Sequence, residues 1–282
     1  MTTLSLQSEL RPSKPNGADP SFGGALRSEW IKLRSLRSTV WSYAIVIAIS
    51  LGMAALVAFA LTTMPEGSAA IDATDGTAGS VVQASLAGVL FAQLVAGVLG
   101  VLVISGEYTT GMIRSTFAAI PTRLPALAAK AVVLFAATFL VGIVANLAGY
   151  VAASLVFAGE GISAPLAEPA VFWPILGAAV WLAMVALFAL GVGAVVRSSA
   201  GGIAAVLGVL LLLPIVLQLI PAEWAQDLVP YLFSTAGSGI YSSSSLESVG
   251  DAFGVWANLL VAGIWVTVSL TAAAVLMRRR DA

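Results

Sequence analysis

Residues 131–157 read AVVLFAATFLVGIVANLAGYVAASLVF, and this run contains no charged side chain. An α-helix needs about 20 residues to cross a hydrocarbon core about 30 Å thick, because each residue adds about 1.5 Å. Backbone groups in lipid have to be hydrogen-bonded within the protein, which leaves helices and closed barrels. Barrel strands are short and alternate apolar with polar residues, a pattern that this run lacks. The run therefore predicts a transmembrane helix.

Five further charge-free runs of comparable length occur along the 282 residues, at 39–63, 81–104, 171–196, 202–220 and 253–277. Hydrophobic residues make up 59% of the chain and charged residues only 10%. A soluble domain carries about 25% charged residues, so the composition excludes a soluble globular protein. The predicted fold class is all-α: a polytopic membrane protein with six transmembrane helices.

The composition also excludes several kinds of chemistry. The chain has no cysteine and no histidine, so it lacks thiolate nucleophiles and the commonest zinc ligand and general base. It has no phosphate-binding loop of the form G-x-x-x-x-G-K-[ST], and its net charge of -1 gives no reason to expect nucleic acid as a partner. We therefore expect no catalytic, cofactor-binding or metal site in this chain.

The thirteen basic residues predict the orientation in the membrane. All of them fall before the first run, between the second and third, between the fourth and fifth, or after the sixth. The three remaining loops contain acidic residues but no basic ones. Because Lys and Arg accumulate on the cytoplasmic side, both termini are predicted to be cytoplasmic. The expected location is the cell (plasma) membrane, with multiple passes.

These features divide the chain into four predicted parts. Residues 1–21 are rich in proline and polar residues and are expected to be a disordered cytoplasmic N-terminus. An amphipathic interfacial helix is expected at 22–38 and the six-helix transmembrane domain at 39–277. A short cytoplasmic C-terminus follows at 278–282.

The segment before the first run has a one-sided apolar pattern. Its large apolar residues recur at helical spacing on one face; they are Phe22, Leu26, Trp30, Leu33 and Leu36. The basic residues of the segment project elsewhere, which is typical of a helix that lies in the membrane interface. Two interpretations stay open: an elbow helix that supports a cytoplasmic partner, and an anchor that only orients the first span.

The link at 105–130 reads SGEYTTGMIRSTFAAIPTRLPALAAK, which is too long for a simple turn and too apolar for a solvated linker. Residues 111–119 are expected to form a short helix that Pro121 ends. Ile113 and Phe117 share one face of that helix. The alternative is a structured loop that merely connects two spans.

Glu107 lies directly after the second run, at the predicted membrane border. An unpaired carboxylate is costly at that depth, so Glu107 is expected to have a basic partner. Arg114 and Arg123 are the candidates.

The spacing of Glu107, Gly111, Pro121 and Lys130 resembles the E-x-x-x-G…P…K signature of type-two ABC exporter permeases, where it also follows the second of six spans. The stretches SEWIKLRSLRST and GEYTTGMIRSTFAAIP resemble members from high-GC Gram-positive bacteria. The similarity covers most of the chain: the N-terminal helix, the six spans and the long outer segment before the last span. Met112 departs from the family, which often has Thr after the glycine.

This resemblance implies that the inner loop carries a coupling helix, which contacts a separate ABC ATPase subunit. It also implies a dimer of permease chains with two ATPase chains. The residues expected to take part in coupling are Glu107, Gly111, Ile113, Arg114, Phe117, Pro121 and Lys130.

The predicted function is the permease subunit of an ABC-type exporter, with ATP hydrolysed on its partner. Since the six runs contain no charge, the expected substrate is amphipathic or hydrophobic: a drug, an antimicrobial peptide or a lipid-like molecule. The alternative is a non-transporting membrane scaffold or sensor anchor.

Few polar side chains interrupt the runs. The amides Gln93, Asn146 and Asn258 either line a translocation path or hold helices together, and the second role is the commoner one in helix bundles.

Small residues and proline predict the local shape of the spans. Gly88 with Ala92, and Ala145 with Gly149, stand at the four-residue spacing that permits close helix packing. Pro174, near the start of the fourth run, and Pro214, inside the fifth, each predict a kink.

Overall fold

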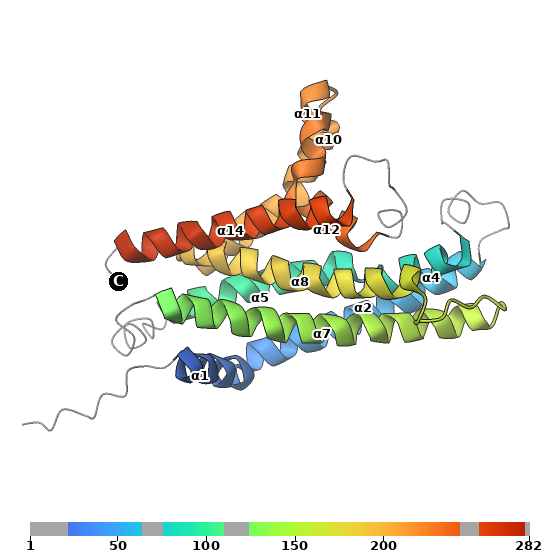
Figure 1. Cartoon of the computed structure of the whole chain (residues 1–282), viewed down its shortest axis with the longest axis horizontal. Helices are drawn as coiled ribbons and strands as arrows, with labels where there is room; N and C mark the ends of the chain where they lie inside the picture. The colour runs from blue at the N-terminus through green and yellow to red at the C-terminus, as the bar shows by residue number, and fades with distance from the viewer. Residues whose placement is uncertain (1–21, 64–75, 110–123, 243–253, 280–282) are drawn as a thin grey trace, which may run out of the picture.

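The structure is a computed structural model that describes residues 22–63, 76–109, 124–242 and 254–279. The chain is helical over these residues and has no strand among them, so the all-α prediction is confirmed. Figure 1 shows long helices that run side by side in a bundle. The elements are α1 (Phe22–Ser35), α2 (Arg37–Thr63), α4 (Gly76–Leu86), α5 (Val89–Thr109), α7 (Leu124–Ala158), α8 (Pro169–Val196), α9 (Ser199–Leu207), η1 (Gly208–Leu212), α10 (Leu213–Leu219), α11 (Glu223–Leu228), η2 (Val229–Tyr231), α12 (Phe233–Tyr241) and α14 (Val255–Arg279).

Six helical stretches of the described chain are long and apolar enough to cross a membrane, and they coincide with the six predicted runs to within a few residues. The chain is therefore a multi-pass membrane protein. The stretches are Arg37–Thr63, Ala78–Tyr108, Leu124–Ala158, Pro169–Val196, Ser199–Leu219 and Val255–Arg279.

Several helices continue past the charge-free runs that predicted them. α7 begins at Leu124 and has 35 residues, so it is about 50 Å long and exceeds a core of about 30 Å. The reason is that a charge-free run marks the part of a helix that lies inside the membrane, whereas backbone hydrogen bonds continue beyond it. Parts of the predicted link at 105–130 therefore belong to the last turn of α5 and the first turns of α7.

Basic residues gather at one end of the bundle. α1, the start of α7 and the end of α14 lie together at the left of Figure 1. Lys32, Lys130 and Arg278 belong to these three stretches. We call this the basic end of the molecule.

A turn at Ala87 and Gly88 divides the second span into α4 and α5. A Cβ atom on Gly88 would lie 2.5 Å from the Cα atom of Ser50 in α2. One on Gly149 of α7 would lie 2.5 Å from the backbone oxygen of Ser85 in α4. Only glycine allows backbones to approach this closely, so the predicted close packing at both glycines is confirmed.

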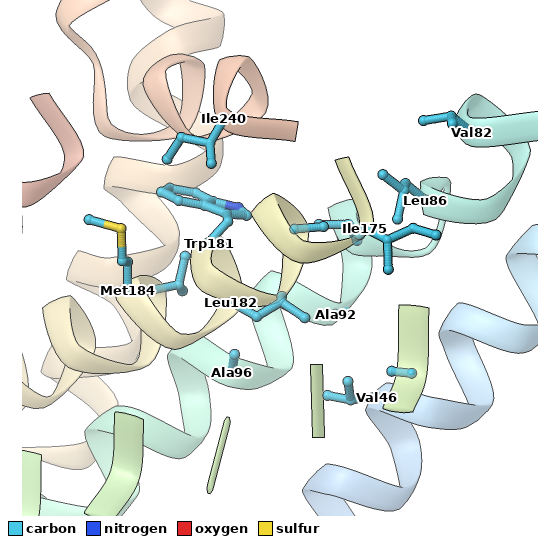
Figure 2. Close-up of a cluster of buried hydrophobic side chains, with 14 of the residues drawn as sticks. Val46, Val82, Leu86, Ala92, Ala96, Ile175, Trp181, Leu182, Met184 and Ile240 are labelled. Atoms are coloured by element: carbon cyan, nitrogen blue, oxygen red, sulfur yellow. The ribbon is translucent and has the colours of Figure 1, made fainter. Parts of the chain in front are cut away.

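α8 is the centre of the bundle. Its most apolar stretch is 72% buried, more than that of any other span in the described chain. Figure 2 shows Trp181 and Leu182 of α8 among side chains of α5 and α12, including Ala92 and Ile240. The Trp181 ring also packs against Phe233 of α12, with ring centroids 4.6 Å apart.

The fifth span bends partway along its length. α9 is followed by the π-helix η1, after which the Leu213 amide donates to the Gly208 carbonyl five residues back. Pro214 follows at once; because its ring lacks an N–H and crowds the preceding turn, regular α-helix is interrupted there. α10 and α11 then point sideways from the bundle (Figure 1). The predicted kink at Pro214 is confirmed.

Candidate functional site

Four charged side chains meet at the basic end, where α1, α5 and α7 come together. The Lys130 ammonium donates to the carboxylates of Glu29 (2.5 Å) and Glu107 (2.9 Å). The Lys32 ammonium donates to the same two residues, at 2.8 Å from Glu29 and 3.2 Å from Glu107. Each cation thus contacts both acids. We call these four residues the ion cluster.

The ion cluster is shielded from its surroundings on most sides. The side chains of Glu29 and Lys130 are each 6% exposed and that of Glu107 is 10% exposed, whereas Lys32 is 30% exposed. An unpaired charge at such burial costs several kcal/mol. Removal of one member of the cluster therefore leaves an uncompensated buried charge on its partner, which destabilises the fold. Two cations and two anions balance each other here.

The pKa values of the two members on α1 show which protonation state the cluster favours. Burial raises the pKa of the Glu29 carboxyl, but the charges and hydrogen bonds of Lys130 and Lys32 outweigh burial, so the net pKa lies below the usual 4.5. Burial lowers the pKa of Lys32, but its contacts with Glu29 and Glu107 outweigh burial and the net pKa lies above 10.5. Both groups are therefore charged around neutral pH.

The ion cluster joins elements that lie far apart in the sequence. Glu107 lies two residues before the end of α5, and Lys130 is the seventh residue of α7. The link at 110–123 runs between these two helices. Glu29 and Lys32 lie one turn apart on α1, so α1 is held to both helices that flank the link.

The sequence placed Glu107 and Lys130 in one motif but did not pair them. The partners of Glu107 in the structure are Lys130 and Lys32. The two arginines considered as partners lie outside the described residues, as do the other predicted coupling residues. These are Gly111, Ile113, Arg114, Phe117, Pro121 and Arg123.

The sequence-based prediction missed two members of the ion cluster, Lys32 and Glu29, although the sequence does contain a signal for Glu29. The signal for it is its spacing: Ala25, Glu29 and Leu33 stand four residues apart and form the buried stripe of α1. An acid in the middle of a buried stripe, on a helix that is otherwise basic, requires a cation from another element.

The exposed and buried faces of α1 differ from the single apolar face that was predicted. Leu33 is buried and Leu26 packs partly against the neighbouring apolar cluster, but Phe22 and Trp30 are 48% and 44% exposed. α1 also ends at Ser35, three residues before the predicted boundary, and α2 starts at Arg37. A position in the membrane interface stays a prediction for this helix.

The three predicted amides each lie between helices. Gln93 of α5 accepts a hydrogen bond from the Trp181 indole at 3.0 Å, and Asn146 of α7 donates to the Ile175 carbonyl at 3.2 Å. Asn258 of α14 is 5% exposed and lies directly against Gly239 of α12. These contacts favour helix packing over a translocation path for all three.

A second contact at the basic end holds α5 to the start of α9. The Ser105 and Ser199 hydroxyls are hydrogen-bonded at 2.9 Å, and the Arg197 guanidinium lies 5.1 Å from the centre of the Tyr108 ring. α5 is thereby joined to α9 as well as to α1 and α7.

Comparison with known families matches residues 25–215 to the model of a family described as ABC-2 family transporter protein. This range starts in α1, ends in α10 and includes all four members of the ion cluster. A comparison with curated proteins finds no match.

Proposed function

Because the chain belongs to the ABC-2 family of transporter proteins, we propose that it is the permease subunit of an exporter whose ATP is hydrolysed by a separate ATPase subunit. Membership of this family makes the chain a membrane component of an ABC transporter and not its catalytic subunit. The direction of transport, the substrate and the contact with the ATPase are the proposed parts.

The ion cluster is the observation that carries the proposal. An ATPase bound at the basic end would contact the link at 110–123, whose flanking helices are α5 and α7. Through Glu107 and Lys130 both helices are paired directly with each other and with α1. A displacement of the link would therefore move the three helices together, because buried ion pairs resist separation.

The proposed orientation puts the basic end in the cytoplasm of the cell, with both termini on that side of the plasma membrane. The support is the position of the basic residues on the described helices: Lys32, Lys130 and Arg278 all lie at one end of the bundle. Positive residues are retained on the cytoplasmic side during insertion.

The proposed substrate is amphipathic or hydrophobic, and the proposed assembly contains a second permease chain. The six charge-free runs offer no counter-charge for an ionic substrate in the membrane interior. The most apolar part of the fifth span is only 17% buried, which leaves surface for a second copy to cover.

Co-expression with the ATPase encoded by a neighbouring reading frame tests the proposal. The complex is captured through a tag on the permease, and uptake of an uncharged hydrophobic dye is followed in inside-out vesicles supplied with ATP. Glu107→Gln is expected to retain the ATPase but to lower ATP-dependent dye uptake at least about tenfold, because it removes the negative charge that accepts hydrogen bonds from both Lys32 and Lys130. Glu223→Gln, at an exposed carboxylate of α11, is the matched control and should behave as the native chain.

Two results would contradict the proposal. One is ATP-dependent uptake by the permease in vesicles that contain no ATPase subunit. The other is native uptake and native ATPase capture in both Glu107→Gln and Lys130→Gln, which would leave the ion cluster without a role in coupling.

A further inference from the structure

A cavity of about 380 Å³ lies beside the ion cluster, between α1, α5 and α7. It exists because α5 and α7 hardly touch each other, while α1 packs on α7 and covers the space between them. Its size falls at the lower end of the range of about 300–1,000 Å³ that small-molecule sites occupy. Neither the ion pairs nor the proposed coupling explains why this space is left open.

The lining of the cavity changes from charged to apolar along the helix axes. α5 runs toward the basic end, so Glu107 lies nearer that end than Leu102 and Val103 do. α7 runs away from it, so Lys130 lies nearer that end than Val133. On both helices the change takes about one turn.

We propose that this cavity binds a phospholipid from the leaflet at the basic end. The phosphate contacts Lys32, and the upper part of one acyl chain lies against Leu102, Val103 and Val133. A lipid in that leaflet has its phosphate toward the basic end and its chains toward the membrane centre. The cavity has the same order of polar and apolar groups in the same direction.

Lys32 is the member of the ion cluster suited to a phosphate. Its ammonium has three N–H donors, of which Glu29 and Glu107 accept two. Its side chain is 30% exposed, whereas the other three members are 10% exposed or less. The exposed residues Arg34 and Arg37 belong to the same stretch of chain, and their positive charge attracts lipid phosphates.

The proposal is tested with the purified full chain in phosphatidylcholine vesicles that contain a photoreactive phosphatidylglycerol, with a diazirine high on one acyl chain. After irradiation, mass spectrometry locates the lipid adducts. The adducts are expected to concentrate on Leu102, Val103 and Val133 rather than on the exposed faces of the spans. A photoreactive diacylglycerol, which lacks the phosphate, forms a second arm of the experiment.

A cavity-filling variant with a matched control separates binding from general contact with the bilayer. Gly106 lines the cavity, and a Cβ atom added there meets no atom within 4 Å, so Gly106→Leu is chosen to place a side chain in this space. Gly52 of α2 is exposed and has equally open surroundings, which makes Gly52→Leu the control. Most cavity adducts should disappear in Gly106→Leu and none in Gly52→Leu.

Lys32→Gln tests the phosphate contact. It should lower the phosphatidylglycerol adducts about tenfold, as expected for one charge-assisted hydrogen bond, and leave the diacylglycerol adducts unchanged. Adducts spread evenly over the exposed spans, or equal adducts in Gly106→Leu and the native chain, would overturn the proposal. So would unchanged phosphatidylglycerol adducts in Lys32→Gln. If that variant does not fold, Gly106→Leu and the two lipid arms still decide.

Discussion

The core around α8 and the ion cluster at the basic end hold helices together by different means. α8 is fixed by rings and small residues: the indole of Trp181 is fully buried, packs against Phe233 and donates a hydrogen bond to Gln93. At the basic end, four charges hold three helices around an open cavity. Close packing holds the helices in one arrangement, because van der Waals contacts are lost when the packed atoms separate by less than about an ångström.

Shared ion pairs behave differently from packed rings. Each lysine of the cluster contacts both acids, so each acid keeps a second cation when one pair is lost. α8 is therefore held fixed by packing, whereas α1, α5 and α7 are joined to one another by shared charges. Each prediction below tests one side of this contrast.

The largest effect is expected from Trp181→Ala in the core. Loss of a fully buried ring leaves a cavity and an unpaired Gln93, and should lower the free energy of unfolding by about 4 kcal/mol. Unfolding in mixed detergent micelles measures this value. Trp173 lies on the same helix but is 52% exposed, so Trp173→Ala is the control and should cost little. Equal losses of unfolding free energy in the two variants would show that burial of the Trp181 ring is not what holds α8 in place.

Lys130→Met should have the next largest effect. The variant leaves Glu29 without its buried partner and should lower the free energy of unfolding by about 3 kcal/mol. The double variant Glu29→Gln with Lys130→Met removes both charges and should recover most of that loss, since Lys32 and Glu107 stay paired. The same micelle measurement compares the two. A double variant less stable than the single one would show that removing both charges does not restore the balance of the ion cluster, and would contradict this prediction.

Gln93→Leu should have a smaller effect, because it removes one neutral hydrogen-bond partner and keeps the packing volume. The Trp181 N–H is then buried without an acceptor, and the expected loss is about 1–2 kcal/mol of unfolding free energy. If the Trp181 ring moves in this variant, the Trp fluorescence spectrum should shift as well. An unchanged stability would mean that this hydrogen bond does not contribute to holding α5 against α8.

The smallest effect concerns pH. The pKa of Glu29 is lowered, so its contribution to stability is present above the unfolded-state pKa and is lost as pH falls through the folded-state pKa. The pKa of Lys32 is raised, so its contribution is present below its unfolded-state pKa and is lost only at very alkaline pH. The Tm should therefore be flat around neutral pH and fall at pH below about 4.5. Glu29→Gln should reduce the acid slope, and a slope identical to that of the native chain would contradict the assignment.

The number and kind of spans were predictable because they depend on one property, the length of a charge-free run of residues. A charge-free run long enough to cross lipid has few alternatives to a helix, and all six runs are helical in the structure. Gly88 and Pro214 were predictable for a similar reason, since backbone approach and a missing N–H are local consequences of residue type.

The ion cluster was only half predictable. Glu107 could be identified as a carboxylate in need of a partner, but its partners depend on how α1 and α7 pack, which no local pattern specifies. Glu29 was missed because helical spacing was followed for apolar residues alone. Counting Glu29 with Ala25 and Leu33 would have shown an acid on the buried stripe.

The separation of the ion-cluster residues along the chain sets an order for biosynthesis. Glu29 and Lys32 are three residues apart, Lys32 and Glu107 are 75 apart, and Glu29 and Lys130 are 101 apart. A ribosome that adds about 5–20 residues per second makes Lys130 about 5–20 s after Glu29. During that interval α1 already exists, but α7 does not. α1 therefore reaches its final position only after α7 has been made, and a ribosome stalled before Lys130 would leave Glu29 without that partner.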